Sequence, residues 1–193
     1  MRIIPPGILI FAFCMNALGQ GRTVEDLQQK AKQIKASKEI HVAYDKFKDQ
    51  LVIMAVPHTM VDAGMGLFSG GVHVLGMGAT VTTPGKVLTT TPDNIAVLFT
   101  SLGGRFQFAK GDATLYLIAD GERYIFPVQG GDANVYHGSA SEQLVYKVSR
   151  AEFTKIMNAK VIEIRLGDSR PQTLKPKLVE VFRSFLQVID VDS

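Results

Sequence analysis

The 193-residue sequence has a single cysteine and no tryptophan. One cysteine excludes an internal disulfide framework and a cysteine-based metal site. The excess of one charge over the other is also small: the chain has 21 basic and 18 acidic residues, a formal net charge of +3. That near balance excludes a disordered polyelectrolyte and offers no strong signal for nucleic acid. With 46% apolar residues, the chain has the size and composition of one folded domain.

The first 19 residues have the order of a secretory signal peptide: a basic start, an apolar run over 3–18 and small residues at 17 and 19. The apolar core is shorter than the roughly 20 residues that span a membrane. We therefore expect cleavage after Gly19 and export to the periplasm or the exterior. The mature chain, 20–193, then has no cysteine and forms a single globular β-rich domain that does not span the membrane. An uncleaved N-terminal anchor is the alternative.

Three segments have helical signals. Thr23 can cap a helix over 24–36, because acidic residues follow it and apolar residues recur at helical spacing. Ser149 and Glu152 form a capping box that opens a short helix through about Asn158. Pro176 starts the last helix, whose apolar stripe predicts burial against the rest of the fold: Leu178, Phe182, Phe185, Leu186 and Ile189.

The body between these helices alternates in the manner of β-strands. Asp120-Gly121 joins two such runs, which is the strongest short signal for a tight hairpin. Glycines between Val61 and Gly78 predict bulges, bends or close backbone approach, and Pro84-Gly85 predicts a strand–turn–strand. The polar segment Gln129–Ser141 is expected to be a long exposed loop. Pro57 is expected to end the second strand or to lie at its edge. The predicted strands are Ile40–Asp45, Leu51–Val56, Ile95–Leu102, Arg105–Ala109, Thr114–Ala119, Glu122–Phe126, Leu144–Val148 and Val161–Leu166.

The fold class predicted from this order is α+β. About eight strands form a mainly antiparallel sheet, open or folded over into a sandwich, with an N-terminal helix and C-terminal helices packed on it. Residues 50–110 carry only five charged side chains, as expected of strands buried in the middle of a sheet.

No complete catalytic, cofactor or metal motif is present. Gly85-Lys86 lacks the flanking residues of a phosphate loop, and the four histidines have no metal-ligand spacing. We assign no catalytic, cofactor-binding or metal-binding residue, and we expect no cofactor. The candidate surface for a ligand or partner is aromatic: Tyr116, Tyr124 and Phe126 lie on the arms of the Asp120-Gly121 hairpin, with Tyr116 and Tyr124 as expected cross-strand neighbours, and His137 lies in the loop that follows.

Two parts of the chain resemble a group of exported bacterial proteins of unknown function. The first is the charged turn in Val42–Asp49, and the second runs from Leu115–Arg123 to the helix after Ser149 and the strand Val161–Leu166. The resemblance extends over 38–189. It implies a bacterial envelope setting and supplies no active-site residues.

The sequence therefore favours an exported, non-enzymatic binding or interaction module of the periplasm or cell envelope. Its partner would be a protein or a small molecule of the envelope, and not nucleic acid. One alternative is a secreted hydrolase whose site is dispersed over the fold. Another is a structural envelope component whose edge strands pair with other chains.

Overall fold

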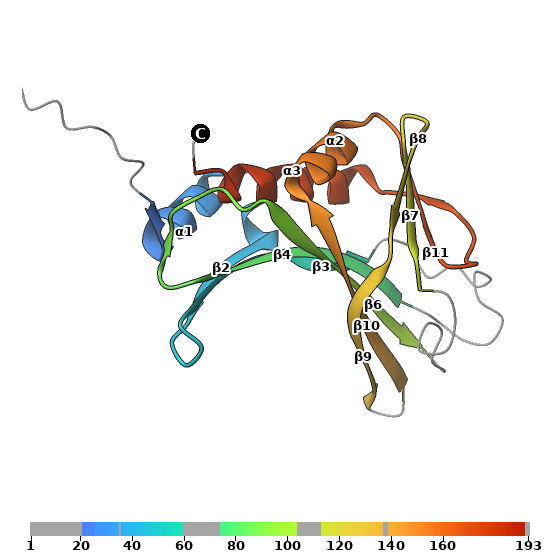
Figure 1. Cartoon of the computed structure of the whole chain (residues 1–193), viewed down its shortest axis with the longest axis horizontal. Coiled ribbons are helices and arrows are strands. Elements are labelled where there is room, and N and C mark those ends of the chain that lie inside the picture. Colours follow the sequence, from blue (N-terminus) through green and yellow to red (C-terminus); the bar gives the residue numbers. More distant parts are fainter. Residues whose placement is uncertain (1–20, 35, 60–73, 104–112, 137–138, 192–193) are drawn as a thin grey trace, which may run out of the picture.

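The computed structural model describes residues 21–34, 36–59, 74–103, 113–136 and 139–191. Within them, a six-stranded and a four-stranded antiparallel sheet share one hydrophobic core with three α-helices (Figure 1). The mainly antiparallel α+β fold expected from the sequence is confirmed. The signal segment 1–19, the glycines from Gly64 to Gly71, the strand expected over Arg105–Ala109, and His137 lie outside the described residues.

The helices begin where the sequence places them. Helix α1 (Val24–Gln33) is capped by Thr23, and α2 (Arg150–Asn158) begins with the predicted capping box of Ser149 and Glu152. Helix α3 (Pro176–Ile189) has proline at its start, where the missing N–H leaves no helical hydrogen bond unmade. All three helices lie along one face of the large sheet (Figure 1). Only the end of α1 differs from expectation, because it lies three residues earlier.

The large sheet has the order β2-β3-β4-β6-β10-β9, and the small sheet has the order β12-β11-β7-β8. Pro127 alone separates β8 from β9, so the chain passes directly from the edge of one sheet to the edge of the other. The small sheet stands at one end of the molecule, beside β10 and β9 (Figure 1). The strands of the large sheet are β2 (Ile40–Asp45), β3 (Gln50–Thr59), β4 (Val74–Pro84), β6 (Asn94–Gly103), β10 (Ser139–Ser149) and β9 (Val128–Tyr136); those of the small sheet are β12 (Gln172–Thr173), β11 (Ile162–Leu166), β7 (Leu115–Ala119) and β8 (Glu122–Phe126).

Aromatic pairs mark the centre of the core. The rings of Phe99 on β6 and Tyr146 on β10 meet edge to face with centroids 5.7 Å apart. Phe153 of α2 and Phe182 of α3 meet in the same manner at 5.4 Å. Each of the four side chains is at most 1% exposed. The Tyr146 hydroxyl donates to the carbonyl of Ala113, which satisfies its polar atom inside the core.

The segment Gln129–Ser141 is not the predicted loop. Most of it is strand β9, the edge of the large sheet, which pairs with residues Ser139 to Tyr146 of β10. Every residue from Val128 to Val135 is exposed. Because nothing in this segment has to be buried, its composition is polar and contains glycine, as in a loop. Its structure comes from backbone pairing with a long neighbour. Gly131 permits the close approach, since a Cβ there would lie 2.6 Å from the Gln143 carbonyl oxygen.

Pro57 does not end β3, and it lies beyond Ala55, the last residue of β3 that pairs with β2. The strand continues to Thr59, and the register with β4 shifts between Ala55 and His58. Such a bulge tolerates proline because the ladder is locally interrupted. A Cβ on Gly78 of β4 would lie 2.9 Å from the Pro57 ring and 2.8 Å from the Ala55 carbonyl oxygen. This is the close backbone approach that the glycines predicted.

The turn at Pro84-Gly85 is present, with Gly85 at φ 75°. Its two flanking strands belong to different sheets, however. Strand β4 stays in the large sheet, whereas β5 (Val87–Leu88) pairs with β1 (Arg22–Thr23) ahead of α1. The turn therefore carries the chain from the sheet to the helical layer and does not close a hairpin.

Candidate functional site

The Asp120-Gly121 turn is a tight hairpin, as predicted. Asp120 has φ 48° and Gly121 has φ 88°, which is the left-handed geometry at both central positions that such a turn requires. The Asp120 carboxylate also accepts hydrogen bonds from the backbone N–H groups of Lys160 and Val161, both at 3.0 Å. These bonds hold the pKa of Asp120 below its usual value, and the hydrogen bond from the Val161 N–H is the largest cause. The turn is thereby tied to the start of β11.

The register of this hairpin separates the predicted aromatic residues. A two-residue turn pairs Ala119 with Glu122, so Tyr116 lies opposite Ile125 and Tyr124 lies opposite Leu117. The expected cross-strand pair of Tyr116 and Tyr124 is therefore wrong. The two tyrosines point to opposite faces of the sheet, because side chains alternate along each strand.

Tyr124 and Phe126 face the core, at 8% and 6% exposure. Removal from water raises the pKa of the Tyr124 phenol, and a hydrogen bond with Glu122 adds to the rise. Three of the four residues predicted for the ligand surface are described by the structure. Among these three, only Tyr116 lies on the solvent face, where it is half-buried.

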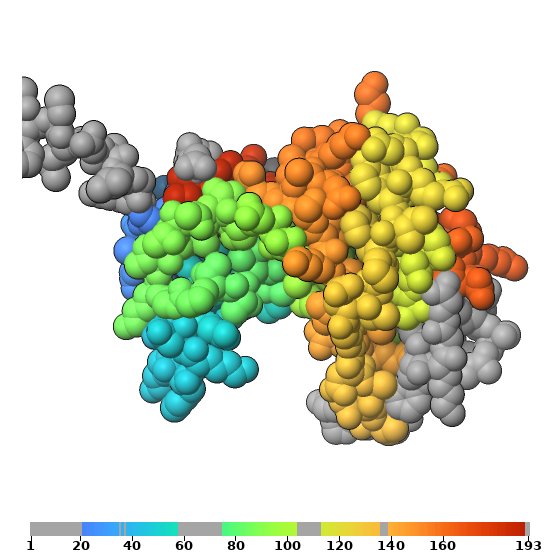
Figure 2. All heavy atoms as spheres, viewed as in Figure 1, coloured from blue at the N-terminus to red at the C-terminus, as the bar shows by residue number. Residues whose placement is uncertain are grey.

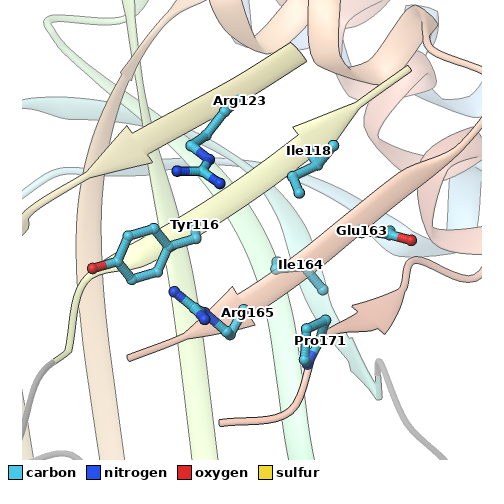
Figure 3. Close-up of a pocket in the computed structure, with 7 residues that line it drawn as sticks. All are labelled: Tyr116, Ile118, Arg123, Glu163, Ile164, Arg165 and Pro171. Atoms are coloured by element: carbon cyan, nitrogen blue, oxygen red, sulfur yellow. The ribbon is translucent and has the colours of Figure 1, made fainter. Parts of the chain in front are cut away.

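A shallow pocket of about 130 Å³ lies on that solvent face of the small sheet. Strand pairing forms its floor: Arg165 of β11 lies opposite Tyr116 of β7, and Glu163 lies opposite Ile118, which in turn lies opposite Arg123 of β8. The neighbouring turn before β12 adds one wall. Figure 3 shows the seven lining residues: Tyr116, Ile118, Arg123, Glu163, Ile164, Arg165 and Pro171.

Two guanidinium groups give the pocket its charge. The Arg165 guanidinium lies over the Tyr116 ring, 4.4 Å from its centroid, in a cation–π contact. Arg123 approaches from the other side of the ring (Figure 3). Among the residues that the structure describes, neither arginine forms an ion pair. The carboxylate of Glu163 points away from both of them (Figure 3).

This arrangement suits an anion attached to an apolar body. Arginine presents a planar fork of N–H donors that matches carboxylate and phosphate oxygens, and it is less strongly hydrated than lysine. The Tyr116 ring and Ile118 offer apolar surface between the two guanidinium groups. Ile125, 54% exposed and opposite Tyr116, extends that surface across β8.

Of the seven lining residues, sequence reasoning named only Tyr116 and missed the two arginines, the two isoleucines, Glu163 and Pro171. Counting outward from the Asp120-Gly121 turn would have placed Arg123 on the face of Tyr116, because a two-residue turn fixes the register. The alternation of β11 places Arg165 on the outward face but gives no sign of the residue beside it. Its position beside Tyr116 depends on the pairing of β11 with β7, which are far apart in the chain.

Two other kinds of site are absent from the residues that the structure describes. No three His, Cys, Asp or Glu side chains gather as metal ligands within the described ranges. No helix in the same ranges has the length and apolarity to cross a membrane.

The fold and the pocket together define an α+β protein with a cationic, aromatic-walled pocket on the outer face of a small antiparallel sheet. Comparison with protein-family models, with curated proteins and with solved structures finds no match for the chain.

Proposed function

We propose that this chain is an exported, non-enzymatic binding module of the bacterial periplasm or cell envelope, and that it binds a small anionic ligand in the pocket of Arg123, Tyr116 and Arg165. The signal-peptide pattern of residues 1–19 supports export. The ligand class follows from the lining: one carboxylate or phosphate group for the guanidinium forks, and a flat or aliphatic body for the ring and the isoleucines.

One observation carries the proposal. Arg165 is stacked on Tyr116 next to Arg123, and no described carboxylate pairs with either cation. Stacking limits the rotamers of a long side chain, so less conformational entropy is lost when an anion binds. The donors are thus held in position before the ligand arrives.

The lining also favours binding over hydrolysis. A hydrolytic site brings a nucleophile or a metal-bound water to a general base within hydrogen-bond distance. This pocket offers two cations, a phenol and one carboxylate that points away from them (Figure 3). These groups hold an anion without moving a proton.

The binding test is a titration of the isotope-labelled protein by NMR, with benzoate and inorganic phosphate as separate probes. Benzoate carries both the charge and the flat body, so it should bind more tightly than phosphate, with saturable shifts confined to β7, β8 and β11. Arg165→Gln and Arg123→Gln should each weaken benzoate binding by about tenfold or more, since a hydrogen bond to a charged group contributes about 1.5–3 kcal/mol.

Lys147→Gln is the matched control, because it removes the same charge from an exposed position on β10 in the large sheet. It should leave benzoate binding unchanged. Equal losses in all three variants would show a general charge effect and contradict a defined site. Shifts outside the small sheet would place the ligand elsewhere.

Export is tested separately by the mass of the protein recovered from the periplasm or medium of a bacterial host. Processing after Gly19 predicts a chain that starts at Gln20, with or without cyclisation of that residue. A recovered chain that retains residues 1–19 would contradict cleavage and favour the anchored alternative.

A further inference from the structure

The tip of the β2–β3 hairpin, Asp45–Asp49, displays an aromatic ring to solvent. Phe47 is 89% exposed, the highest value for a large hydrophobic side chain among the described residues. The hairpin projects from the body of the molecule (Figures 1 and 2). A single exposed apolar side chain is common at a protein surface, so the ring gains its significance from the charged groups beside it.

The tip is braced by its own hydrogen bonds. The Asp45 carboxylate accepts from the backbone N–H groups of Phe47 at 2.9 Å and Lys48 at 3.3 Å. Asp49, at φ 50°, accepts a 2.6 Å hydrogen bond from the Tyr44 hydroxyl. Both carboxylates therefore accept hydrogen bonds within the hairpin tip, and these bonds fix the backbone that carries the Phe47 ring.

Three lysines lie at this tip or on the turn attached to it. Lys46 and Lys48 flank Phe47 in the chain, and the Lys46 ammonium lies 5.1 Å from the centroid of its ring. Lys86 joins them from the neighbouring turn, with its ammonium 4.9 Å from the centre of the Tyr44 ring. The backbone of that turn is attached to the tip, since the Gly85 N–H donates to the Asp49 carbonyl at 2.8 Å. None of the three lysines has an ion pair within the part of the chain described.

From this geometry we propose that the tip is an interfacial anchor that docks on an anionic lipid surface. Phe47 enters the boundary between headgroups and acyl chains, while the long side chains of Lys46, Lys48 and Lys86 keep their ammonium groups at the level of the lipid phosphates. A protein pocket would also take a lone ring. The lipid surface is favoured because the three lysines are spread over the tip and the adjoining turn, and a broad surface of negative charge can meet all of them at once.

Docking of this kind leaves the pocket of the small sheet accessible. The β2–β3 hairpin and the β7–β8–β11 sheet lie at opposite ends of the long axis of the molecule (Figure 1). The anchor is independent of the pocket: either can be present without the other.

The absence of tryptophan from the chain makes a direct test simple. Phe47→Trp places a single indole at the tip, where it should fold normally because the position is exposed. With phosphatidylglycerol vesicles, its fluorescence should shift to the blue and be quenched by lipids brominated in their acyl chains. With phosphatidylcholine vesicles, both effects should be much smaller. In the Phe47→Trp protein, each of Lys46→Gln, Lys48→Gln and Lys86→Gln should weaken binding about fivefold, which corresponds to about 1 kcal/mol per lysine near an anionic surface.

Ile125→Trp is the matched control, since it places the indole on the small sheet at an exposed apolar position, 54% exposed in the native protein. Its emission should not change with either vesicle. The readout reports the tip itself, so retention of the N-terminal apolar segment cannot imitate it. An unchanged emission of the Phe47→Trp protein with phosphatidylglycerol vesicles would overturn the proposal, as would a shift that appears only with an acidic protein partner.

Discussion

Asp120 links the β7–β8 turn to the chain that leaves α2. Its backbone N–H donates to the Val161 carbonyl at 3.1 Å, while its carboxylate accepts from Lys160 and Val161. The carboxylate is charged when it makes these bonds, and they lower its pKa. One side chain in the left-handed region therefore fixes the relation between the hairpin and β11, and so the relation between Tyr116 and Arg165.

We predict that Asp120→Asn lowers the thermal midpoint at pH 7, because asparagine tolerates the positive φ but lacks the charge that strengthens the bonds. The folded-state pKa of Asp120 lies below the unfolded-state value of about 3.9. Its contribution to stability is therefore complete above that value and is lost as pH falls through the folded-state pKa. Thermal melts from pH 7 to pH 2 should show the two proteins converging in acid. A constant difference would contradict a role for the charge.

Gly121 has a conformational role only. A Cβ at this position would meet nothing within 4 Å, so space does not restrict it, whereas its φ of 88° does. Gly121→Val should lower the free energy of unfolding by more than about 1 kcal/mol through backbone strain. Gly121→Asn should cost less, because asparagine enters the left-handed region more readily. Denaturant titration of both variants measures the difference, and equal midpoints for valine and glycine would contradict the turn geometry.

At the scale of elements, α3 shows how a pattern in the sequence becomes part of the core. Its apolar stripe is buried as predicted, with Phe182 at 0% exposure against Phe153, and Leu186 only partly buried. The expectation that this face is buried against the rest of the fold is confirmed.

Phe182→Ala should therefore lower the free energy of unfolding by about 3–5 kcal/mol, from lost burial and the cavity left behind. Gln187→Ala, on the exposed side of the same helix, should change it by less than about 0.5 kcal/mol. Chemical denaturation with a common slope for all proteins provides the measurement. If the alanine variant of Phe182 unfolds too readily to purify, Phe182→Leu should show a smaller loss in the same direction.

At the scale of the whole molecule, the two ends of the described chain are held together. The Arg22 guanidinium donates to the Val191 carbonyl at 3.2 Å, and the Lys30 ammonium donates to the Asp190 carbonyl at 3.1 Å. Burial is the largest cause of the lowered pKa of Lys30. The Asp190 carboxylate pairs with Arg150 of α2 at 3.2 Å. The end of α3 thus connects α1 and α2 on the helical side of the large sheet.

Asp190→Ala should lower the free energy of unfolding by about 1–3 kcal/mol, because the partly buried Arg150 loses its carboxylate partner. Asp168→Ala, which removes an exposed carboxylate from the turn after β11, should have little effect. Calorimetry of the three proteins compares them directly. Equal midpoints for the two variants would show that the junction of the termini contributes no more than an ordinary surface charge.

For the candidate site, the sequence was sufficient only where the interaction is local. The Asp120-Gly121 turn was predictable because positive φ at two successive positions limits the residues that fit there. The faces of Tyr116 and Tyr124 follow from the same turn once the pairing is counted from Ala119 and Glu122. The contact of Tyr116 with Arg165 could not be predicted from local sequence patterns, since it depends on which distant strand pairs with β7.

The sequence by itself determined the helix starts, the alternation of β11 and the α+β class, because capping, period and turn chemistry act within a few residues. Tertiary structure decided that Gln129–Ser141 is mostly strand, because the backbone of β10 supplies hydrogen bonds that outweigh the loop-like composition of the segment. It also decided that β3 continues through Pro57, because a bulge against β4 removes the need for the missing N–H. Pairing between distant strands carries no local signature, and the cationic pocket of the small sheet is a product of that pairing.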